Sequence, residues 1–419
     1  MQENLEKELE KIYIIQPITR ENSEKYRVLQ EEAVALIESA GALYAGTIYQ
    51  KIREINASTF VGEGKLEELR EILSGLENIT VLFNGELSPS QTLNISVALD
   101  DRKVIDRTTL ILDIFAKNAR TSEGKLQVEL AQLKYLYPRL KGKGMALSRL
   151  GGGVGTRGPG ETQLETDRRY IRGRLNYLEN RLKELEKRRT LLTDRRKKTG
   201  VKTIALVGYT NTGKSTLMNL LTGSDVYVKN ELFATLDPTS RAFQIEGVEF
   251  LLVDTVGFLQ DLPHGLIKAF HSTLESAVNA DLALIVCDGL GEYDMQIDTT
   301  LATLRELDFS APYLVVVNKT ENMADKTLLP VNSIAISAKE NLGIEDLKRE
   351  ILKEFSNDFL FCKLFVPYEK LSEYAKLKNN LVERSSEFLD DGQAIEVVIP
   401  FEYLDLFQPF IVEKLNLFA

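Results

Sequence analysis

The segment from Gly208 to Ser215 constrains the fold of this chain more than any other stretch. It reads Gly-Tyr-Thr-Asn-Thr-Gly-Lys-Ser, fits the pattern G-x-x-x-x-G-K-[ST], and directly follows the apolar run Thr203–Val207. A strand, a glycine-rich turn and a helix in this order predict backbone N–H groups that point at phosphates. The positive end of the helix also favours an anion there. We therefore predict a nucleoside-triphosphate site, with Lys214 at the outer phosphates and Ser215 on Mg²⁺.

Positive charge is concentrated in one block of the chain. The protein has 419 residues and a net charge of −10, yet residues 121–200 hold 20 Lys and Arg against 9 Asp and Glu. That block carries +11 and leaves −21 for the remainder. A basic segment in an acidic protein indicates a localised nucleic-acid contact, with a solvated helical face as the alternative.

Other bulk features indicate a globular protein. The first residues are acidic and polar, which argues against a signal peptide, and no apolar run approaches the ~20 residues that span a bilayer. Cys287 and Cys362 lack metal-ligand spacing, and Cys287 lies in an apolar run where we expect it to be buried. We expect a cytoplasmic monomer without a membrane segment.

Four parts follow one another along the chain, and together they predict an α/β fold. Alternating strand and helix patterns predict an N-terminal α/β domain over residues 1–108, with a mostly parallel sheet. A basic helical hairpin with a glycine-rich loop occupies 109–198. A doubly wound P-loop domain occupies 199–355, and a small α+β domain with two strands around a polar helix occupies 356–419.

The hairpin is predicted from two heptad patterns. Apolar residues recur at steps of three and four residues from Leu126 to Leu140, with Tyr137 among them. The pattern recurs from Ile171 to Leu185 and, after Arg189, reaches Leu192. Their seams pair best as antiparallel helices. The connection over 141–160 is longer than a helix–helix turn needs and mixes glycines with lysines and arginines. We interpret it as a finger that reaches phosphates, with a flexible linker as the alternative.

Four further motifs follow the phosphate loop in the order that a GTPase requires. Thr235, in a polar stretch, offers a hydroxyl to Mg²⁺, and Asp254 ends a buried strand where it would hold Mg²⁺ through water. Gly257 would approach the terminal phosphate by its backbone. Two later loops, which begin at Asn318 and Ser337, would form the base pocket at the carboxyl ends of strands.

These motifs give the complete set of predicted site residues. Catalysis is assigned to Lys214, Thr235 and Gly257, and the metal ligands are Ser215 and Thr235. The predicted nucleotide contacts are Gly208, Tyr209, Thr210, Asn211, Thr212, Gly213, Lys214, Ser215, Thr216, Phe233, Ala234, Thr235, Leu236, Asp237, Asp254, Thr255, Val256, Gly257, Asn318, Lys319, Thr320, Glu321, Ser337, Ala338 and Lys339.

Two positions depart from the usual GTPase pattern. Glu321 stands where N-K-x-D has aspartate, which keeps the carboxylate that guanine requires but moves it by one methylene. This predicts a weakened guanine preference, and an unselective pocket is the alternative. Phe258 stands where Ras-type enzymes place the glutamine that orients the attacking water, so we expect slow hydrolysis that a partner completes.

Several segments together resemble one family. The stretch from Gly151 to Arg169 resembles the signature of HflX-type GTPases, in the Obg–HflX branch, and so do Gln127–Leu133, Ser88–Gln91, Gly62–Lys65 and Phe233–Pro238. The resemblance implies a cytoplasmic GTPase that uses GTP and Mg²⁺, with Ser215 and Thr235 as metal ligands. It also implies binding to the large ribosomal subunit and its ribosomal RNA, the splitting of stalled ribosomes, and hydrolysis stimulated by the ribosome.

By the same resemblance, the basic finger would approach the peptidyl-transferase region. Some relatives are said to use ATP through the N-terminal domain, but Gly62–Lys65 is no complete second phosphate loop. Two other functions remain open at this point. One is an RNA-remodelling NTPase that prefers ATP and acts on free RNA, and the other is a scaffold whose bound nucleotide only stabilises domain packing.

Overall fold

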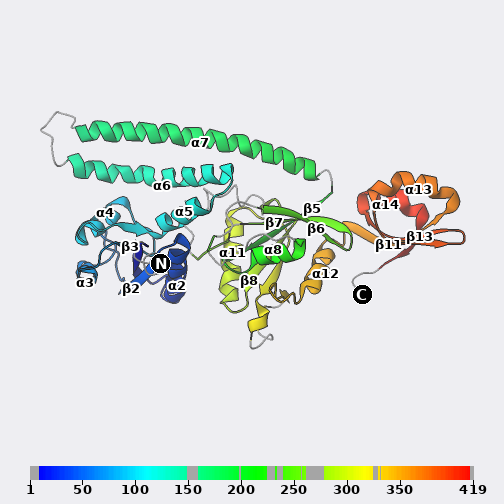
Figure 1. Cartoon of the computed structure of the whole chain (residues 1–419), viewed down its shortest axis with the longest axis horizontal. Coiled ribbons are helices and arrows are strands. Elements are labelled where there is room, and N and C mark those ends of the chain that lie inside the picture. The colour runs from blue at the N-terminus through cyan, green and yellow to red at the C-terminus, as the bar shows by residue number, and fades with distance from the viewer. Residues whose placement is uncertain are drawn as a thin grey trace, which may run out of the picture. The chain divides into compact units, whose positions relative to one another are not determined.

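The computed structural model describes residues 9–148, 159–197, 200–223, 232–233, 239–255, 257–260, 278–323, 329–330 and 332–415. The chain forms two compact units (Figure 1). The first comprises Met1–Arg195, Val228–Pro238 and Thr255–Glu275, and the second comprises Arg196–Tyr227, Thr239–Asp254 and Ser276–Ala419. Among the described helices, none is long and apolar enough to cross a membrane. The predicted α/β fold class is confirmed.

The first unit begins with a parallel four-stranded sheet of order β2-β1-β3-β4. Its strands and helices alternate as predicted, and Ile15, Phe83, Leu69 and Ile95 lie in its core. The elements are β1 (Lys11–Ile18), α2 (Tyr26–Ala40), β2 (Leu43–Lys51), α3 (Glu63–Leu73), β3 (Ile79–Phe83), α4 (Pro89–Ala98), β4 (Val104–Asp106) and α5 (Arg107–Asn118).

Two long helices follow, α6 (Ser122–Ser148) and α7 (Pro159–Lys197), and lie side by side (Figure 1). Ion pairs join Glu123 to Arg189 at 3.2 Å and Glu129 to Arg174 at 2.6 Å, so the helices are antiparallel as predicted. The predicted loop over 141–160 is wrong for residues 141–148, which continue α6, and for residues 159–160, which begin α7. Lysine, methionine, alanine and leucine favour helix, and each interior glycine opposes it by only about 1 kcal/mol. The glycine-rich residues 149–158 lie outside the described part, and the finger stays a prediction.

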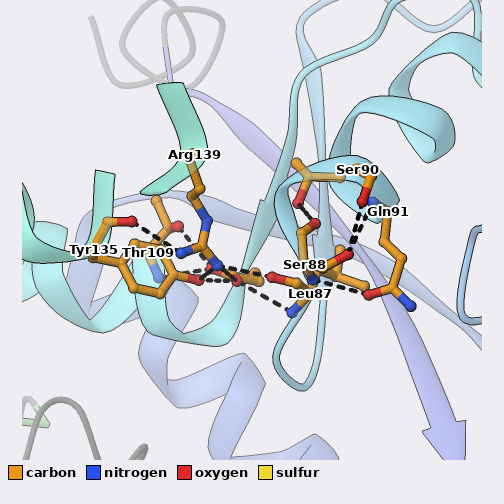
Figure 2. Close-up of polar contacts among 9 residues, drawn as sticks. Leu87, Ser88, Ser90, Gln91, Thr109, Tyr135 and Arg139 are labelled. Atoms are coloured by element: carbon orange, nitrogen blue, oxygen red, sulfur yellow. Dashed lines mark hydrogen bonds and ion pairs between the residues drawn. The ribbon is translucent and has the colours of Figure 1, made fainter. Parts of the chain in front are cut away.

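A buried carboxylate fixes α6 to the parallel-sheet part of the first unit. Asp106 is 2% exposed, caps α5 through the Thr109 N–H at 3.0 Å, and accepts hydrogen bonds from Tyr135 and Arg139 of α6. Figure 2 shows the Arg139 guanidinium between Tyr135 and Leu87, whose carbonyl it contacts at 2.8 Å. Because Asp106, Tyr135 and Arg139 hydrogen-bond to one another, this network gives α6 one defined position on the domain.

The second unit carries a six-stranded sheet of order β10-β9-β8-β5-β7-β6, in which only β6 runs antiparallel to its neighbour. The doubly wound arrangement agrees with the expected P-loop domain. The elements are β5 (Lys202–Gly208), α8 (Lys214–Thr222), β6 (Thr239–Ile245), β7 (Val248–Asp254), β8 (Leu282–Asp288), α11 (Tyr293–Glu306), β9 (Tyr313–Asn318), η1 (Thr320–Asn322), β10 (Ser333–Ala335) and α12 (Ile344–Glu354).

The last part of the chain is an antiparallel sheet of order β12-β13-β11-β14, with α13 and α14 packed on it (Figure 1). The sequence predicts only two of these strands, because β12 is mostly exposed and β14 is short. The elements are β11 (Phe359–Pro367), α13 (Leu371–Leu377), β12 (Val382–Leu389), β13 (Gly392–Pro400), α14 (Leu404–Phe407) and β14 (Ile411–Lys414). The division of the chain at residues 108, 198 and 355 stays a prediction.

Candidate functional site

The phosphate loop joins β5 to α8 and depends on two glycines. Gly208 has φ 142° and Gly213 has φ 92°, conformations that residues with a Cβ rarely adopt. A Cβ on Gly208 would lie 2.2 Å from the Val286 carbonyl oxygen, and one on Gly213 would lie 2.3 Å from Asn318 Nδ2. The loop therefore forms a close-packed turn at the carboxyl end of β5, as the motif predicts. Its shape fits a phosphate cradle.

Lys214 is the buried cation of this loop. Its side chain is 7% exposed, and its ammonium donates to the carbonyl oxygens of Gly208 at 3.1 Å and Tyr209 at 2.6 Å. Burial lowers the pKa of Lys214 to about 8, and the nearby Asp254 carboxylate opposes that shift. A bound phosphate would add negative charge beside the ammonium and raise its pKa again.

This pKa predicts that GTP affinity falls as the pH rises above about 8. Below that pH Lys214 is already charged, whereas above it binding must recruit a proton, which weakens affinity by at most about tenfold per pH unit. The measurement is a binding titration from about pH 7 to about pH 10. The same titration on Lys214→Arg separates this effect from guanine N1–H, which also loses a proton in base. Identical profiles for the two proteins would contradict the prediction.

Ser215 and Asp254 form an oxygen pair beside the loop. The Ser215 hydroxyl donates to Asp254 Oδ2 at 2.7 Å, and Asp254 is 2% exposed at the end of β7. Hydroxyl and carboxylate oxygens suit Mg²⁺, which binds few protein ligands and keeps several waters. No cluster of three or more His, Cys, Asp and Glu occurs in the described part of the chain. The pair therefore fits a magnesium ion that phosphate oxygens and water complete.

The loop after β9 is bound to the phosphate loop. Asn318, 3% exposed, donates to the Thr212 carbonyl at 2.8 Å and accepts from the Ala338 N–H at 2.9 Å. Lys319 donates to the Asn211 carbonyl at 2.8 Å and pairs with Asp288 at 2.6 Å. The two predicted base loops and the phosphate loop thus form one connected site in the second unit.

Asp288 is a site residue that the sequence analysis missed. It is the last residue of β8, and its carboxylate forms the ion pair with Lys319. The backbone N–H of Asp288 donates to the side-chain oxygen of Gln296 at 2.9 Å. An aspartate at the carboxyl end of a buried parallel strand was the available signal, because ligand sites form at that edge.

Glu321 lies in η1 beside Ser337. A hydrogen bond from the Ser337 hydroxyl, reinforced by Lys339 and Lys319, holds the pKa of Glu321 below its usual value. The second carboxylate oxygen, Oε2, is buried and has no hydrogen-bond partner in the described part of the chain. Such an orphaned acceptor is unfavourable by about 1–3 kcal/mol. A ring N–H and an amino group of guanine would satisfy it.

Phe233, the first residue of the predicted Thr235 stretch, and its neighbour Leu232 belong to the first unit. The Leu232 N–H donates to Ser39 Oγ at 2.9 Å, and the Phe233 carbonyl accepts from Asn118 Nδ2 at 2.9 Å. Phe233 has φ 57° and its ring packs edge-on against Phe115, with centroids 4.6 Å apart. The side chain of this predicted nucleotide contact is therefore buried against α5.

The residues around the predicted catalytic glycine also belong to the first unit. Phe258 is 1% exposed and Gly257 is buried. The Gln260 carbonyl accepts from Arg107, whose guanidinium also pairs with Glu32 at 2.6 Å. Because the Phe258 ring is a core side chain here, it cannot orient water in this arrangement.

Some of the other predicted residues lie in the described part of the chain and others do not. Thr216 lies in α8, Thr320 donates a hydrogen bond to the Ile336 carbonyl in a buried position, and Thr255 is fully buried. Lys339 is exposed at the surface. Ala234, Thr235, Leu236, Asp237 and Val256 lie outside the described residues.

Three family models match successive parts of the chain. They are described as the GTP-binding GTPase N-terminal region over residues 28–116, the GTP-binding GTPase middle region over 118–196, and the 50S ribosome-binding GTPase over 203–319.

The chain is also similar to curated proteins and to a solved structure. GTPase HflX of Caldanaerobacter subterraneus subsp. tengcongensis is 44% identical over 98% of this chain and 96% of its own length. GTPase HflX of Escherichia coli is 42% identical over 80% of this chain and 81% of its own. A GTP-binding protein from Sulfolobus solfataricus in complex with GDP is 25% identical, with a TM-score of 0.44 over 83% of this chain and 99% of that one.

Proposed function

This chain belongs to the HflX family of GTPases, and on that premise we propose that it binds the large ribosomal subunit in a nucleotide-dependent way and splits or rescues stalled ribosomes. The protein is a GTP hydrolase and binds guanine nucleotide, as its family does. The resemblance found in the sequence is thereby confirmed.

The proposal includes the roles of the site residues. Lys214 would neutralise the outer phosphates, and Ser215 and Thr235 would bind Mg²⁺ with Asp254 acting through water. Gly257 would contact the terminal phosphate by its backbone N–H. The geometry around Lys214 and Ser215 supports these roles, because both side chains already converge on the phosphate loop.

One observation in particular supports a partner that contains RNA, such as the large ribosomal subunit. On α7, Arg168, Arg169 and Arg172 line a hollow of about 440 Å³ together with Glu165 and Thr166. Neither Arg168 nor Arg169 has an ion-pair partner among the described residues. The neighbouring Tyr170 is 73% exposed. Unpaired guanidinium groups beside an exposed aromatic ring suit phosphates and unstacked bases of structured RNA.

We expect binding to large subunits to weaken with salt, and the loss of these three arginines to flatten that dependence. Arg168→Ala/Arg169→Ala/Arg172→Ala should lower the slope of log affinity against log salt by about two to three. The measurement is cosedimentation with purified large subunits over a salt series, with GTP, GDP or a non-hydrolysable GTP analogue.

The matched control removes three positive charges from α12 instead. Lys348→Ala/Arg349→Ala/Lys353→Ala alters residues that pair with acids on their own helix. It should retain the slope of the unaltered protein. The proposal would be excluded if the two triple variants had equal slopes of log affinity against log salt. It would also be excluded if binding to large subunits depended on neither salt concentration nor nucleotide.

The alternative of an ATP-driven enzyme acting on free RNA is disfavoured by Glu321. Its buried Oε2 has no donor among the residues that the structure describes, and adenine offers neither the ring N–H nor the amino group at that edge. Hydrolysis assays with GTP and ATP, each with free ribosomal RNA and with large subunits, distinguish the two functions. Greater stimulation by free RNA with ATP would favour the alternative.

A further inference from the structure

Asp254 is the last residue of β7, which pairs with β5 on one side and with β6 on the other. Leu206 of β5 lies opposite Asp254, and β6 and β7 form a hairpin that pairs without a register shift from Thr239↔Asp254 to Ile245↔Val248. Within the described residues, β6 pairs with no strand other than β7. The far end of this hairpin, the turn Glu246–Gly247, is therefore a point from which its position can be controlled.

The C-terminal sheet contacts that turn directly. Arg384 of β12 forms an ion pair with Glu246, and its guanidinium also lies 5.9 Å from the centre of the Phe361 ring. Gly247 has φ 84°, and a Cβ there would lie 2.9 Å from Val382 Cγ1. The turn is thus held by charge on one residue and by close packing on the next.

Apolar packing extends this contact along β7. Phe250 packs against Phe355 with ring centroids 5.3 Å apart and against Phe359 of β11 at 6.4 Å. Phe361 and Val398, from two strands of the C-terminal sheet, lie in the same core as Leu252. The C-terminal domain and the nucleotide-binding domain therefore share one hydrophobic core.

The face of β7 that carries this packing also carries Asp254. Side chains alternate along a strand, so Phe250, Leu252 and Asp254 point to one side. Leu217 of α8, the helix that starts at the phosphate loop, lies in the same core. On this face of β7, Asp254 accepts the hydrogen bond from Ser215 at one end of the strand. The C-terminal domain packs against the same face towards the other end of the strand.

We infer that the C-terminal domain positions Asp254 for magnesium by holding the β6–β7 hairpin, and that Arg384 and Val382 are the positioning residues. The inference rests on the proposed magnesium role of Asp254. It assigns the domain a task in nucleotide retention. The pairing with β5 holds β7 at the phosphate loop, and the C-terminal domain holds the hairpin at its turn. Release of the turn would let the hairpin tilt and move the Asp254 carboxylate away from Ser215.

The test uses the full-length protein and the release of a fluorescent N-methylanthraniloyl GDP, with Mg²⁺ and with chelator. Arg384→Glu places like charges at the turn and should speed release in Mg²⁺ by about fivefold, the scale of an exposed ion pair. Release in chelator should be unchanged. The charge swap Arg384→Glu/Glu246→Arg should restore slow release.

Two controls keep the outcome unambiguous. Lys370→Glu reverses a charge in the same domain whose ammonium lies 5.8 Å from the centre of the Phe410 ring, away from β12, and should leave release unchanged. Asp254→Asn tests the premise, since it should remove most of the slowing by Mg²⁺. Thermal melting checks each variant, and Glu246→Ala replaces Arg384→Glu if that variant melts early.

The outcomes separate the inference from its premise. If Asp254→Asn loses the magnesium effect while Arg384→Glu and Glu246→Ala keep it, the positioning role is wrong and the site assignment stands. If Asp254→Asn keeps the magnesium effect, both are wrong. Faster release in Mg²⁺ that the charge swap reverses supports the inference.

Discussion

Replacing Lys214 by alanine should lower GTP hydrolysis by at least about a hundredfold, the scale seen when one transition-state donor is removed from a buried site. The lysine is 7% exposed, so its charge acts where water screens little. The change also leaves the Gly208 and Tyr209 carbonyls without their shared donor, which loosens the loop itself. Single-turnover phosphate release at saturating GTP measures the effect.

The same variant tests whether the nucleotide controls binding to the ribosome. Lys214→Ala should bind large subunits equally with GTP and GDP, whereas the unaltered protein should distinguish them. Lys348→Ala on α12 removes one charge from a surface pair and serves as the control. A variant that hydrolyses GTP normally, or still distinguishes the nucleotides, would refute the role of Lys214. Unchanged subunit binding with and without nucleotide in both proteins would favour a scaffold.

The second large effect concerns base selection by Glu321. Glu321→Ala should reduce the preference for GDP over ADP by about a hundredfold or more, because sites built on hydrogen bonds discriminate by that order or higher. Its buried Oε2 has no donor within the described residues, and the ring N–H and amino group of guanine would supply one. Competition of GDP, ADP and IDP against a fluorescent nucleotide measures the preference.

Two conservative variants define what the carboxylate contributes. Glu321→Gln keeps the size but replaces one acceptor by donors, and should lose selectivity almost as far as alanine. Glu321→Asp shortens the side chain to the usual length and should raise the preference for guanine. If all four proteins discriminate equally, Glu321 is an exposed loop acid with no part in recognition.

The phosphate loop and the parallel sheets could be predicted because local chemistry decides them. Gly208 and Gly213 occupy conformations and contacts that exclude a Cβ, so their spacing is visible in the sequence. The capping box of Ser88 and Gln91, with Pro89 at the first helical position, likewise fixes the start of α4. In such places sequence and structure agree.

Other features depend on tertiary contacts and could not be predicted. The strand β12 has few buried side chains, and its pairing with β13 decides its conformation. Asp288 forms its ion pair with Lys319 only because β8 and β9 are neighbours in the sheet. The burial of Phe233 against Phe115 joins residues 118 positions apart, which no local pattern signals.

The buried Asp106 cluster has a thermodynamic consequence for the arginine surface of α7. Arg172 donates to Tyr137 of α6 at 2.9 Å, two residues from the Tyr135 that Asp106 binds. The arginines therefore stand on a backbone that is ordered before any partner arrives. Ordering flexible side chains at an interface opposes binding by about 0.5–1.5 kcal/mol each. Prior order of the backbone leaves only the guanidinium rotamers to be fixed, so more of the attraction to phosphates remains as affinity.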